Sequence, residues 1–288
     1  MITMLTGLAT VLLPMLYLML WGSYLWFFYQ EKASARGWGR VLSVVVLLVH
    51  VSLVILRGQE LGRFPLGSPL ELASMMALCL TTIYVVIERV LKVCQTGVLI
   101  IGLAFLLQFL ASAFAFQVPA DNPLLHDPGY VIHAVLVLLA YTALSLGFLY
   151  AVLYGWLSRQ LLRRSFGLAF RRLPPLETLE RLSVSAVRLG VPMLFLALAS
   201  GHLWMYSLRD MLSAEQASRL SPFDPKVLSS WVILIIYGVG LIGHDRWGWR
   251  GRRMNRMAIA TWIIVVIVLG IIHHVFPTFH DFSLRDGV

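Results

Sequence analysis

The sequence has few charged residues for its length. Of its 288 residues, 13% are charged and 59% are hydrophobic, and the mean hydropathy is +0.82. A soluble domain of this size cannot bury so much apolar surface, which excludes the soluble globular class. The composition therefore predicts a polytopic membrane protein, in which each helix needs roughly 20 apolar residues to cross the bilayer.

Cysteine is also scarce. The two cysteines, Cys79 and Cys94, are 15 positions apart on one expected helix. At the rise of an α-helix they would lie about 22 Å apart, which is too far for a disulfide. The sequence contains neither a CxxC nor a CxxCH motif. This excludes a thiol–disulfide carrier and a c-type cytochrome.

The motifs of common catalytic sites are missing as well. The sequence has no Gly-rich phosphate loop after a strand, no Ser/His/Asp order that stands out, and no acid pair within an apolar run. The net charge of +9 could suggest nucleic acid, but the cations lie in short connections between apolar runs, as they do in membrane proteins. We therefore expect lipid around the helices and no nucleic-acid partner.

Eight apolar runs divide the sequence. The first is too long for the core of a signal peptide and lacks a small-residue cleavage pattern, so we expect it to remain as a helix. The predicted fold is an all-α membrane helix bundle with about eight transmembrane helices, in a single integral-membrane domain over residues 1–288. The predicted helices are residues 5–28, 38–56, 70–88, 97–116, 130–157, 182–207, 228–244 and 256–276.

The basic residues predict the orientation of these helices. Of the 23 Lys and Arg residues, 17 lie in or beside the first, third, fifth and seventh connections. Short cytoplasmic loops carry the excess of positive charge in membrane proteins. We therefore expect these connections in the cytoplasm and both termini outside, on the periplasmic side of a bacterial inner membrane.

This orientation places several histidines near the outer surface. His50, His133 and His202 come from the second, fifth and sixth predicted helices, and the eighth carries His273 and His274. An unpaired polar ring is costly in hydrocarbon, so each of these rings needs a partner. Any one of them could hydrogen-bond a neighbour near the interface. Four helical sites at one depth favour metal or porphyrin ligation instead.

Haem iron and zinc are the two candidate metals. Neutral imidazole is a common axial ligand of haem iron, and two facing helices can supply a pair. The neighbours His273 and His274 point about 100° apart on a helix, so we expect one of them to face inward. Structural zinc usually needs cysteine or closely spaced histidines, although these two with His280 and Asp281 could form a surface site.

The segment 201–231 is the expected mouth of this site. His202 and Trp204 end one apolar helix, and Asp224 and Lys226 precede the next. A histidine and a tryptophan thus lie at one lip and an Asp-Pro-Lys turn at the other. We interpret the segment as a mouth for a flat, apolar, metal-bearing ligand, with haem as the favoured candidate.

Motifs along most of the chain carry a family resemblance. They are Phe64-Pro65 with Glu71; His133 with Tyr141 and Gly147; Leu176-Glu177 through Gly190; Ser200-Gly201 with Trp204; Asp224-Pro225-Lys226 with Trp231 and Tyr237; His244; Gly248 through Arg253; and His273-His274. In these motifs the sequence resembles the CcsA/HemX/YpjD-type cytochrome c assembly proteins, a haem-handling family of membrane proteins.

The resemblance implies a haem site at the outer face. In the family an outer tryptophan-rich segment presents haem, and two flanking histidines ligate the iron. The resemblance implies that the corresponding ligands in this sequence are His133 and either His273 or His274. His244 resembles the family's histidine near the inner face, where haem is thought to enter.

The tryptophan-rich segment differs in this sequence. No tryptophan lies between Trp204 and Asp224, whereas the haem-delivering members have several there. This pattern resembles the HemX or YpjD branch. The leading hypothesis is an inner-membrane protein that binds haem b at its outer face, where it relays or holds haem in c-type cytochrome biogenesis. The resemblance also implies a second assembly subunit in the membrane as partner.

The residue assignments follow from this hypothesis, and none of them is catalytic. The iron is expected between His133 and His273, and the further ligand candidates are His274, His202, His50 and His244. The candidates for contact with the porphyrin or its propionates are Trp204, Asp224, Lys226, Arg209, Tyr206 and Glu71. Glu71, at the start of a predicted helix, also complements the helix dipole.

Two other hypotheses stay open. The first is a haem-free scaffold or regulator of cytochrome or haem biosynthesis complexes that kept the fold and lost the ligand. The second is a secondary transporter for another solute. The transporter is less favoured because neither an inverted repeat nor an ion site in the middle of the membrane is visible in the sequence.

Overall fold

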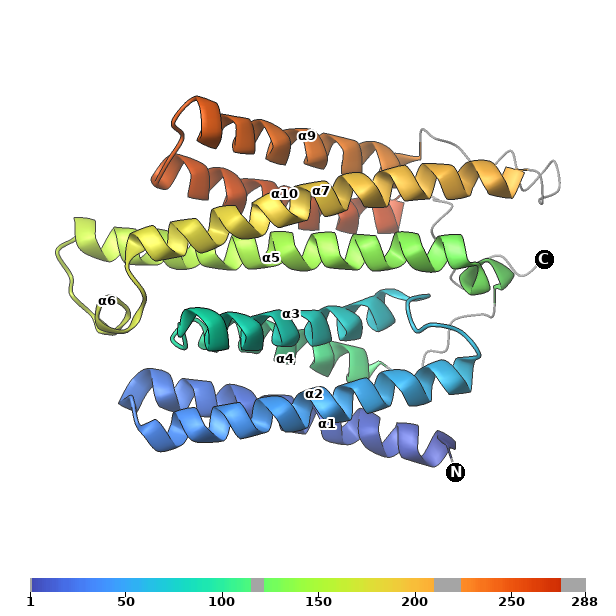
Figure 1. Cartoon of the computed structure of the whole chain (residues 1–288), viewed down its shortest axis with the longest axis horizontal. Helices are drawn as coiled ribbons and strands as arrows, with labels where there is room; N and C mark the ends of the chain where they lie inside the picture. Colours follow the sequence, from blue (N-terminus) through green and yellow to red (C-terminus); the bar gives the residue numbers. More distant parts are fainter. Residues whose placement is uncertain (1, 115–121, 210–223, 276–288) are drawn as a thin grey trace. The chain divides into compact units, whose positions relative to one another are not determined.

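The computed structural model describes residues 2–114, 122–209 and 224–275, and this part of the chain is helical and has no strand. Its eight helices of 17 residues or more match the eight predicted runs (Figure 1). They are α1 (Ile2–Gln30), α2 (Ala33–Leu61), α3 (Pro69–Leu91), α4 (Gly97–Ala113), α5 (Pro128–Leu162), α7 (Leu176–Arg209), α9 (Pro225–Arg246) and α10 (Arg252–Val275). Two short elements, η1 (Pro123–His126) and α6 (Leu168–Arg172), lie in the connections. The all-α prediction is confirmed.

Six of the described helices are long and apolar enough to cross a membrane, namely α1, α2, α3, α5, α7 and α9. The apolar helix α4 is shorter, at 17 residues, and α10 begins with two arginines, Arg252 and Arg253. A polytopic membrane bundle is therefore supported by the structure. Eight crossings and an outer location of both termini stay predictions.

The chain divides into two compact units. The first contains residues 1–119 and 157–175, and the second contains residues 120–156 and 176–288. In the first unit α1 packs against α2 and α4, and α3 packs against α4. In the second unit α9 packs against both α7 and α10. The single domain over residues 1–288 stays a prediction.

Aromatic side chains and small residues build the core of the first unit. Tyr17, Leu20 and Tyr84 are fully buried there. Gly97 begins α4 directly beneath two tyrosine rings, and a Cβ at this position would lie 2.5 Å from both the Tyr24 ring and the Tyr84 hydroxyl. Only a glycine permits so close an approach of α4 to α1 and α3.

Both cysteines belong to this first unit and are free thiols, as the sequence predicts. Cys94 lies in the short connection between α3 and α4, where the Arg36 guanidinium contacts its Sγ atom. Burial raises the pKa of the Cys94 thiol, and Arg36 acts in the opposite direction.

The connection between α2 and α3 is closed by polar contacts. The Ser68 hydroxyl accepts a hydrogen bond from the Glu71 amide at 3.1 Å and so caps α3. The Glu71 carboxylate accepts a hydrogen bond from the Gly67 amide at 2.7 Å and two from the Arg63 guanidinium at 2.9 and 3.2 Å. The Arg63 side chain is only 3% exposed and that of Glu71 10%, so this is a buried, bidentate ion pair.

In the second unit, glycines allow α5 and α7 to pack closely. A Cβ at Gly147 of α5 would lie 2.9 Å from Val187, and the Ser183 hydroxyl donates to the Gly147 carbonyl at 2.8 Å. A Cβ at Gly190 of α7 would lie 2.8 Å from Leu144. Small residues at a membrane helix interface bring the two backbones together in this way. The same interface carries two of the predicted histidines.

Candidate functional site

His133 of α5 reaches across to the backbone of α7. Its Nδ1 atom lies 2.8 Å from the Ala197 carbonyl oxygen. The ring also lies over Gly201, where a Cβ would be only 2.7 Å from Nδ1. His202 follows Gly201 directly in α7. The structure therefore brings together two of the predicted ligands, one from each helix.

His202 is held in a similar way within its own helix. Its Nδ1 atom lies 2.8 Å from the Leu198 carbonyl oxygen, one turn earlier in α7. The Trp231 ring of α9 lies edge-on to the imidazole, with 5.9 Å between ring centroids and an interplanar angle of 64°. Trp231 in turn packs against Phe195 of α7. Two helices, α7 and α9, thus contribute these contacts around His202.

These hydrogen bonds define the tautomers of the two rings. A carbonyl oxygen can only accept, so Nδ1 of His133 and of His202 must be the protonated nitrogen. In a neutral imidazole the lone pair then resides on Nε2. Metal-binding histidines commonly donate one ring N–H to a backbone carbonyl and bind the metal with the other nitrogen. In both histidines, Nε2 is therefore the nitrogen suited to ligate haem iron.

Trp204 takes part in the packing of the α5 start. It is 7% exposed, and its ring lies 5.6 Å from that of Tyr130. Gly129 makes room for it, since a Cβ there would lie 2.3 Å from Trp204. Its neighbour Tyr206 points to the other side of α7 and is 55% exposed. In this arrangement Trp204 is a packing residue, and Tyr206 is the more accessible aromatic side chain.

The predicted Asp-Pro-Lys lip forms the start of α9. Asp224 is the N-cap residue, and its buried carboxylate accepts a hydrogen bond from the Lys226 amide at 2.8 Å. The Lys226 side chain is half-buried. The side chains of Arg209, His273 and His274 lie outside the described residues, although the backbone places all three in the last turns of α7 and α10.

The remaining predicted residues belong to other surroundings. In the first unit, His50 is fully buried with both ring nitrogens hydrogen-bonded, Nδ1 to Tyr17 and Nε2 to Ser74. This arrangement leaves neither nitrogen for iron. Glu71 of the same unit is bound to Arg63. His244 lies in the last turn of α9, and its Nδ1 contacts Asp245 at 2.8 Å.

Three residues near these histidines were not among the predicted site residues. Trp231 packs edge-on to His202, Gly201 accommodates His133, and Gly129 accommodates Trp204. Trp231 and Gly201 stand in the motifs quoted above, but a motif does not show which helix faces which. Gly129 has no sequence signal beyond its place at the start of α5.

If His133 is a haem ligand, as the family resemblance implies, Gly201→Ala is expected to lower haem affinity without removing that ligand. The new Cβ would displace the His133 ring and break its bond to Ala197. Loss of such an orienting bond typically costs 10- to 100-fold in metal affinity. Haem titration of the purified variant measures the effect. Gly238→Ala in α9 is the control, because a Cβ there meets nothing within 4 Å. Equal affinities of the two variants would contradict the role of the His133 bond.

Comparisons with known proteins agree on one family. The sequence model of the family described as "Cytochrome C assembly protein" matches residues 66–280. Inner membrane protein YpjD of Escherichia coli K12 is 29% identical over 248 residues, which is 83% of this chain and 86% of that protein. Protein HemX of Bacillus subtilis is 32% identical over 61% of this chain and 62% of its own length. Cytochrome c biogenesis protein CcsA of Mesostigma viride is 23% identical over 76% and 77%. No solved structure matches.

Proposed function

Because the chain belongs to the cytochrome c assembly protein family, we propose that it holds or relays haem b at the outer face of the bacterial inner membrane during c-type cytochrome biogenesis. The Escherichia coli relative is named an inner membrane protein, which supports the proposed location. The CcsA relative is named a cytochrome c biogenesis protein, which supports the proposed process. The six long apolar helices support a multi-pass location. Haem is the cargo of this function.

One observation carries the proposal. His133 donates its Nδ1 proton to the Ala197 carbonyl across the α5–α7 interface, so that Nε2 is the nitrogen that can bind iron. His273 or His274, near the end of α10, is proposed as the second ligand. His202 lies beside His133 and presents the same tautomer. It is the nearest replacement ligand from α7.

The other residues of the mouth are proposed to position the cargo. Lys226 and Arg209 are the cations proposed to bind the propionates. Arg209 is the last residue of α7, and Lys226 is the second residue of α9, the next helix in the described part of the chain. Asp224 fixes the start of α9 and thereby the position of Lys226. Tyr206 can offer an exposed ring to the porphyrin. His244, near the predicted inner face, is proposed as the entry point.

Absorption spectra of the detergent-purified protein test the proposal directly. Protein produced with ample haem is expected to show a Soret band and, after reduction, the visible bands of a low-spin haem b. A noncovalent cargo should be extracted by acidic organic solvent, whereas a c-type haem would stay attached. Protein that purifies without a Soret band, and gains none on titration with haem, would contradict it.

A haem-free scaffold is the second candidate function. The packing of Trp204 against Tyr130 favours it, since a buried ring is not presented to a ligand. The scaffold would bind a second membrane subunit of cytochrome assembly. A variant with His133, His202, His273 and His274 all replaced should then retain its partner in a pull-down. Loss of the partner only in this variant would favour the haem-dependent function.

A further inference from the structure

The end of α5 and the connection that follows it carry an excess of positive charge. Residues 157–175, which we call the basic segment, contain five arginines and no acidic residue. Four of these side chains are exposed and form no ion pair with the described residues, namely Arg159, Arg163, Arg164 and Arg171. The positive charge of the segment is therefore not neutralised within the described part of the chain.

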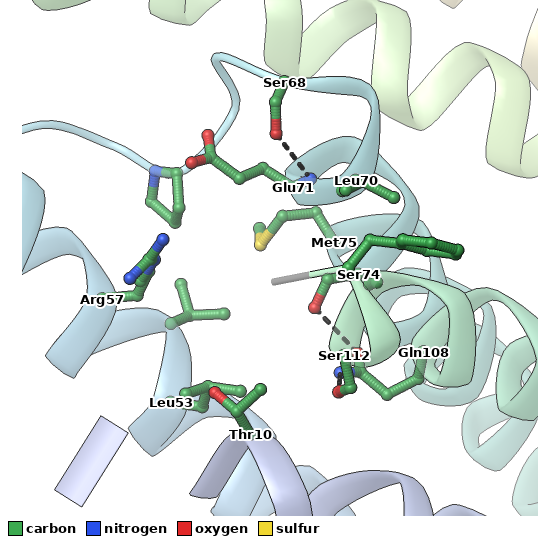
Figure 2. A pocket seen from close by; sticks show the side chains of 14 residues that line it. Thr10, Leu53, Arg57, Ser68, Leu70, Glu71, Ser74, Met75, Gln108 and Ser112 are labelled. Atoms are coloured by element: carbon green, nitrogen blue, oxygen red, sulfur yellow. Dashed lines mark hydrogen bonds between the residues drawn. The ribbon is translucent and has the colours of Figure 1, made fainter. Parts of the chain in front are cut away.

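At the other end of the first unit, arginines are neutralised by carboxylates. That end carries a pocket of about 70 Å³, whose wall includes Arg57 and Glu71 (Figure 2). Arg57 is paired with Glu60 at 3.0 Å, and Glu71 is paired with Arg63 at 2.9 Å. The charges of these two pairs balance, whereas those of the basic segment do not.

Backbone hydrogen bonds shape the basic segment. Where α5 ends, the Ser165 amide donates to the Gln160 carbonyl at 3.0 Å, and the Arg164 amide donates to the Leu161 carbonyl at 3.1 Å. These two bonds form a Schellman motif, whose left-handed position usually holds glycine. Arg164 occupies that position, with a φ of 50°. The Gln160 side chain also accepts a hydrogen bond from the Phe170 amide at 3.1 Å, which holds α6 against the end of α5.

An ion pair ties the basic segment to the level of the membrane interface. Arg172 pairs with Glu31, and its guanidinium donates to the Tyr29 carbonyl at 3.2 Å. Both partners lie at the end of α1, a helix long and apolar enough to cross a membrane. Near this end Tyr29 is 61% exposed and Trp26 38%. Exposed tyrosine and tryptophan at the ends of membrane helices are typical of the headgroup region, so the segment lies at headgroup level.

Apolar side chains are exposed among the arginines. Phe166 is 54% exposed and Phe170 38%, and their rings lie edge-on with 4.8 Å between centroids. Leu162 and Leu168 are exposed in the same segment, whereas Ala169 of α6 is buried. Exposed rings combined with basic side chains are characteristic of segments that bind the surface of an anionic membrane.

We propose that the basic segment docks on the anionic phospholipid headgroups of the leaflet at this end of the first unit. The guanidinium groups bind lipid phosphates, and the rings of Phe166 and Phe170 lie at the boundary between headgroups and acyl chains. In the predicted orientation this leaflet is the cytoplasmic one. An acidic protein would match the arginines alone, whereas lipid matches both the arginines and the rings.

Spin labelling of the whole chain tests the docking. A nitroxide is attached at Ser165→Cys, an exposed position, after the two native thiols have been replaced by Cys79→Ala and Cys94→Ser. The labelled protein is placed in bilayer discs of phosphatidylcholine, either alone or mixed with phosphatidylglycerol. Collisions with a neutral, water-soluble nickel chelate should be at least about threefold fewer with phosphatidylglycerol, since each arginine near an anionic surface strengthens binding about fivefold. The difference should shrink at high salt, which screens exposed charges.

Two double variants of the labelled protein separate the basic segment from the overall charge. Arg163→Gln with Arg171→Gln should weaken docking roughly 25-fold and raise the collision rate toward its value in phosphatidylcholine. Arg246→Gln with Arg250→Gln is the matched control, because it removes two exposed charges at the connection between α9 and α10. This control should keep the low collision rate.

Two results would overturn the proposal. The first is an equal collision rate in the two kinds of disc before any arginine is replaced, which would leave an acidic protein as the partner that the charges fit. The second is an equal collision rate in the two double variants in phosphatidylglycerol discs, because the attraction would then not reside in the basic segment.

Discussion

Replacing His133 with alanine is expected to reduce haem binding on the order of tenfold or more, since loss of even an orienting contact of a metal ligand costs 10- to 100-fold. His133 is the proposed ligand whose ring is fixed by a bond to a second helix, Nδ1 to the Ala197 carbonyl. A ligand fixed in this way needs little ordering when iron binds. The measurement is the Soret absorbance per mole of protein after purification with haem supplied.

His126→Ala is the control for this substitution. His126 is an exposed residue of the short helix η1 at the same end of α5. It should leave the Soret absorbance unchanged. Added imidazole should restore haem binding to His133→Ala, because the free ring can occupy the space that the substitution leaves. Unchanged absorbance in His133→Ala, or no rescue by imidazole in a folded variant that has lost haem, would contradict ligation by His133.

The eight helices could be predicted from the sequence because hydropathy alone determines where a membrane chain is helical. Without water, each crossing must satisfy its own backbone bonds, and helices do so within the segment. The observed helices extend most of the predicted runs by a few polar residues, as in α2, which ends at Leu61 and not at residue 56. Hydropathy does not detect such ends, because the backbone bonds of a helix continue into the interface.

The grouping of the histidines could be predicted only in part. Orientation and position along a helix give the depth of a side chain, and on that basis His50, His133 and His202 were expected together. The direction of a side chain around its helix depends on which helices pack together. His133 and His202 meet because glycines bring α5 and α7 close. His50 bonds Tyr17 and Ser74 within the first unit.

For Glu71, the sequence predicted the position at a helix start but not the pairing with Arg63. A serine followed three positions later by a glutamate is typical of a helix start, and Ser68 and Glu71 occupy these positions in α3. The predicted charge at the helix N-terminus is thus present. Arg63 could not be assigned as its partner from the sequence, because the pairing depends on the path of the intervening connection.

Glu71→Gln is expected to destabilise the protein by roughly 3–5 kcal/mol, because it leaves the buried Arg63 guanidinium without its counter-charge. Thermal unfolding in detergent should show a clear drop, with haem content measured in parallel. Glu60→Gln is the matched control, since its partner Arg57 is partly exposed and such pairs contribute about 0–1 kcal/mol. The double variant Arg63→Met with Glu71→Leu should recover much of the loss, since it removes both charges and keeps the volume.

The same variants decide between the two roles assigned to Glu71. If the carboxylate serves the fold, Glu71→Gln lowers the unfolding temperature while the haem content of the folded fraction stays at the wild-type level. If Glu71 contacts the porphyrin, haem content falls in Glu71→Gln and does not recover in the apolar double variant. The bidentate bonds to Arg63 and the bond to the Gly67 amide use both carboxylate oxygens. Binding a porphyrin would require breaking at least one of them, so we expect the first result.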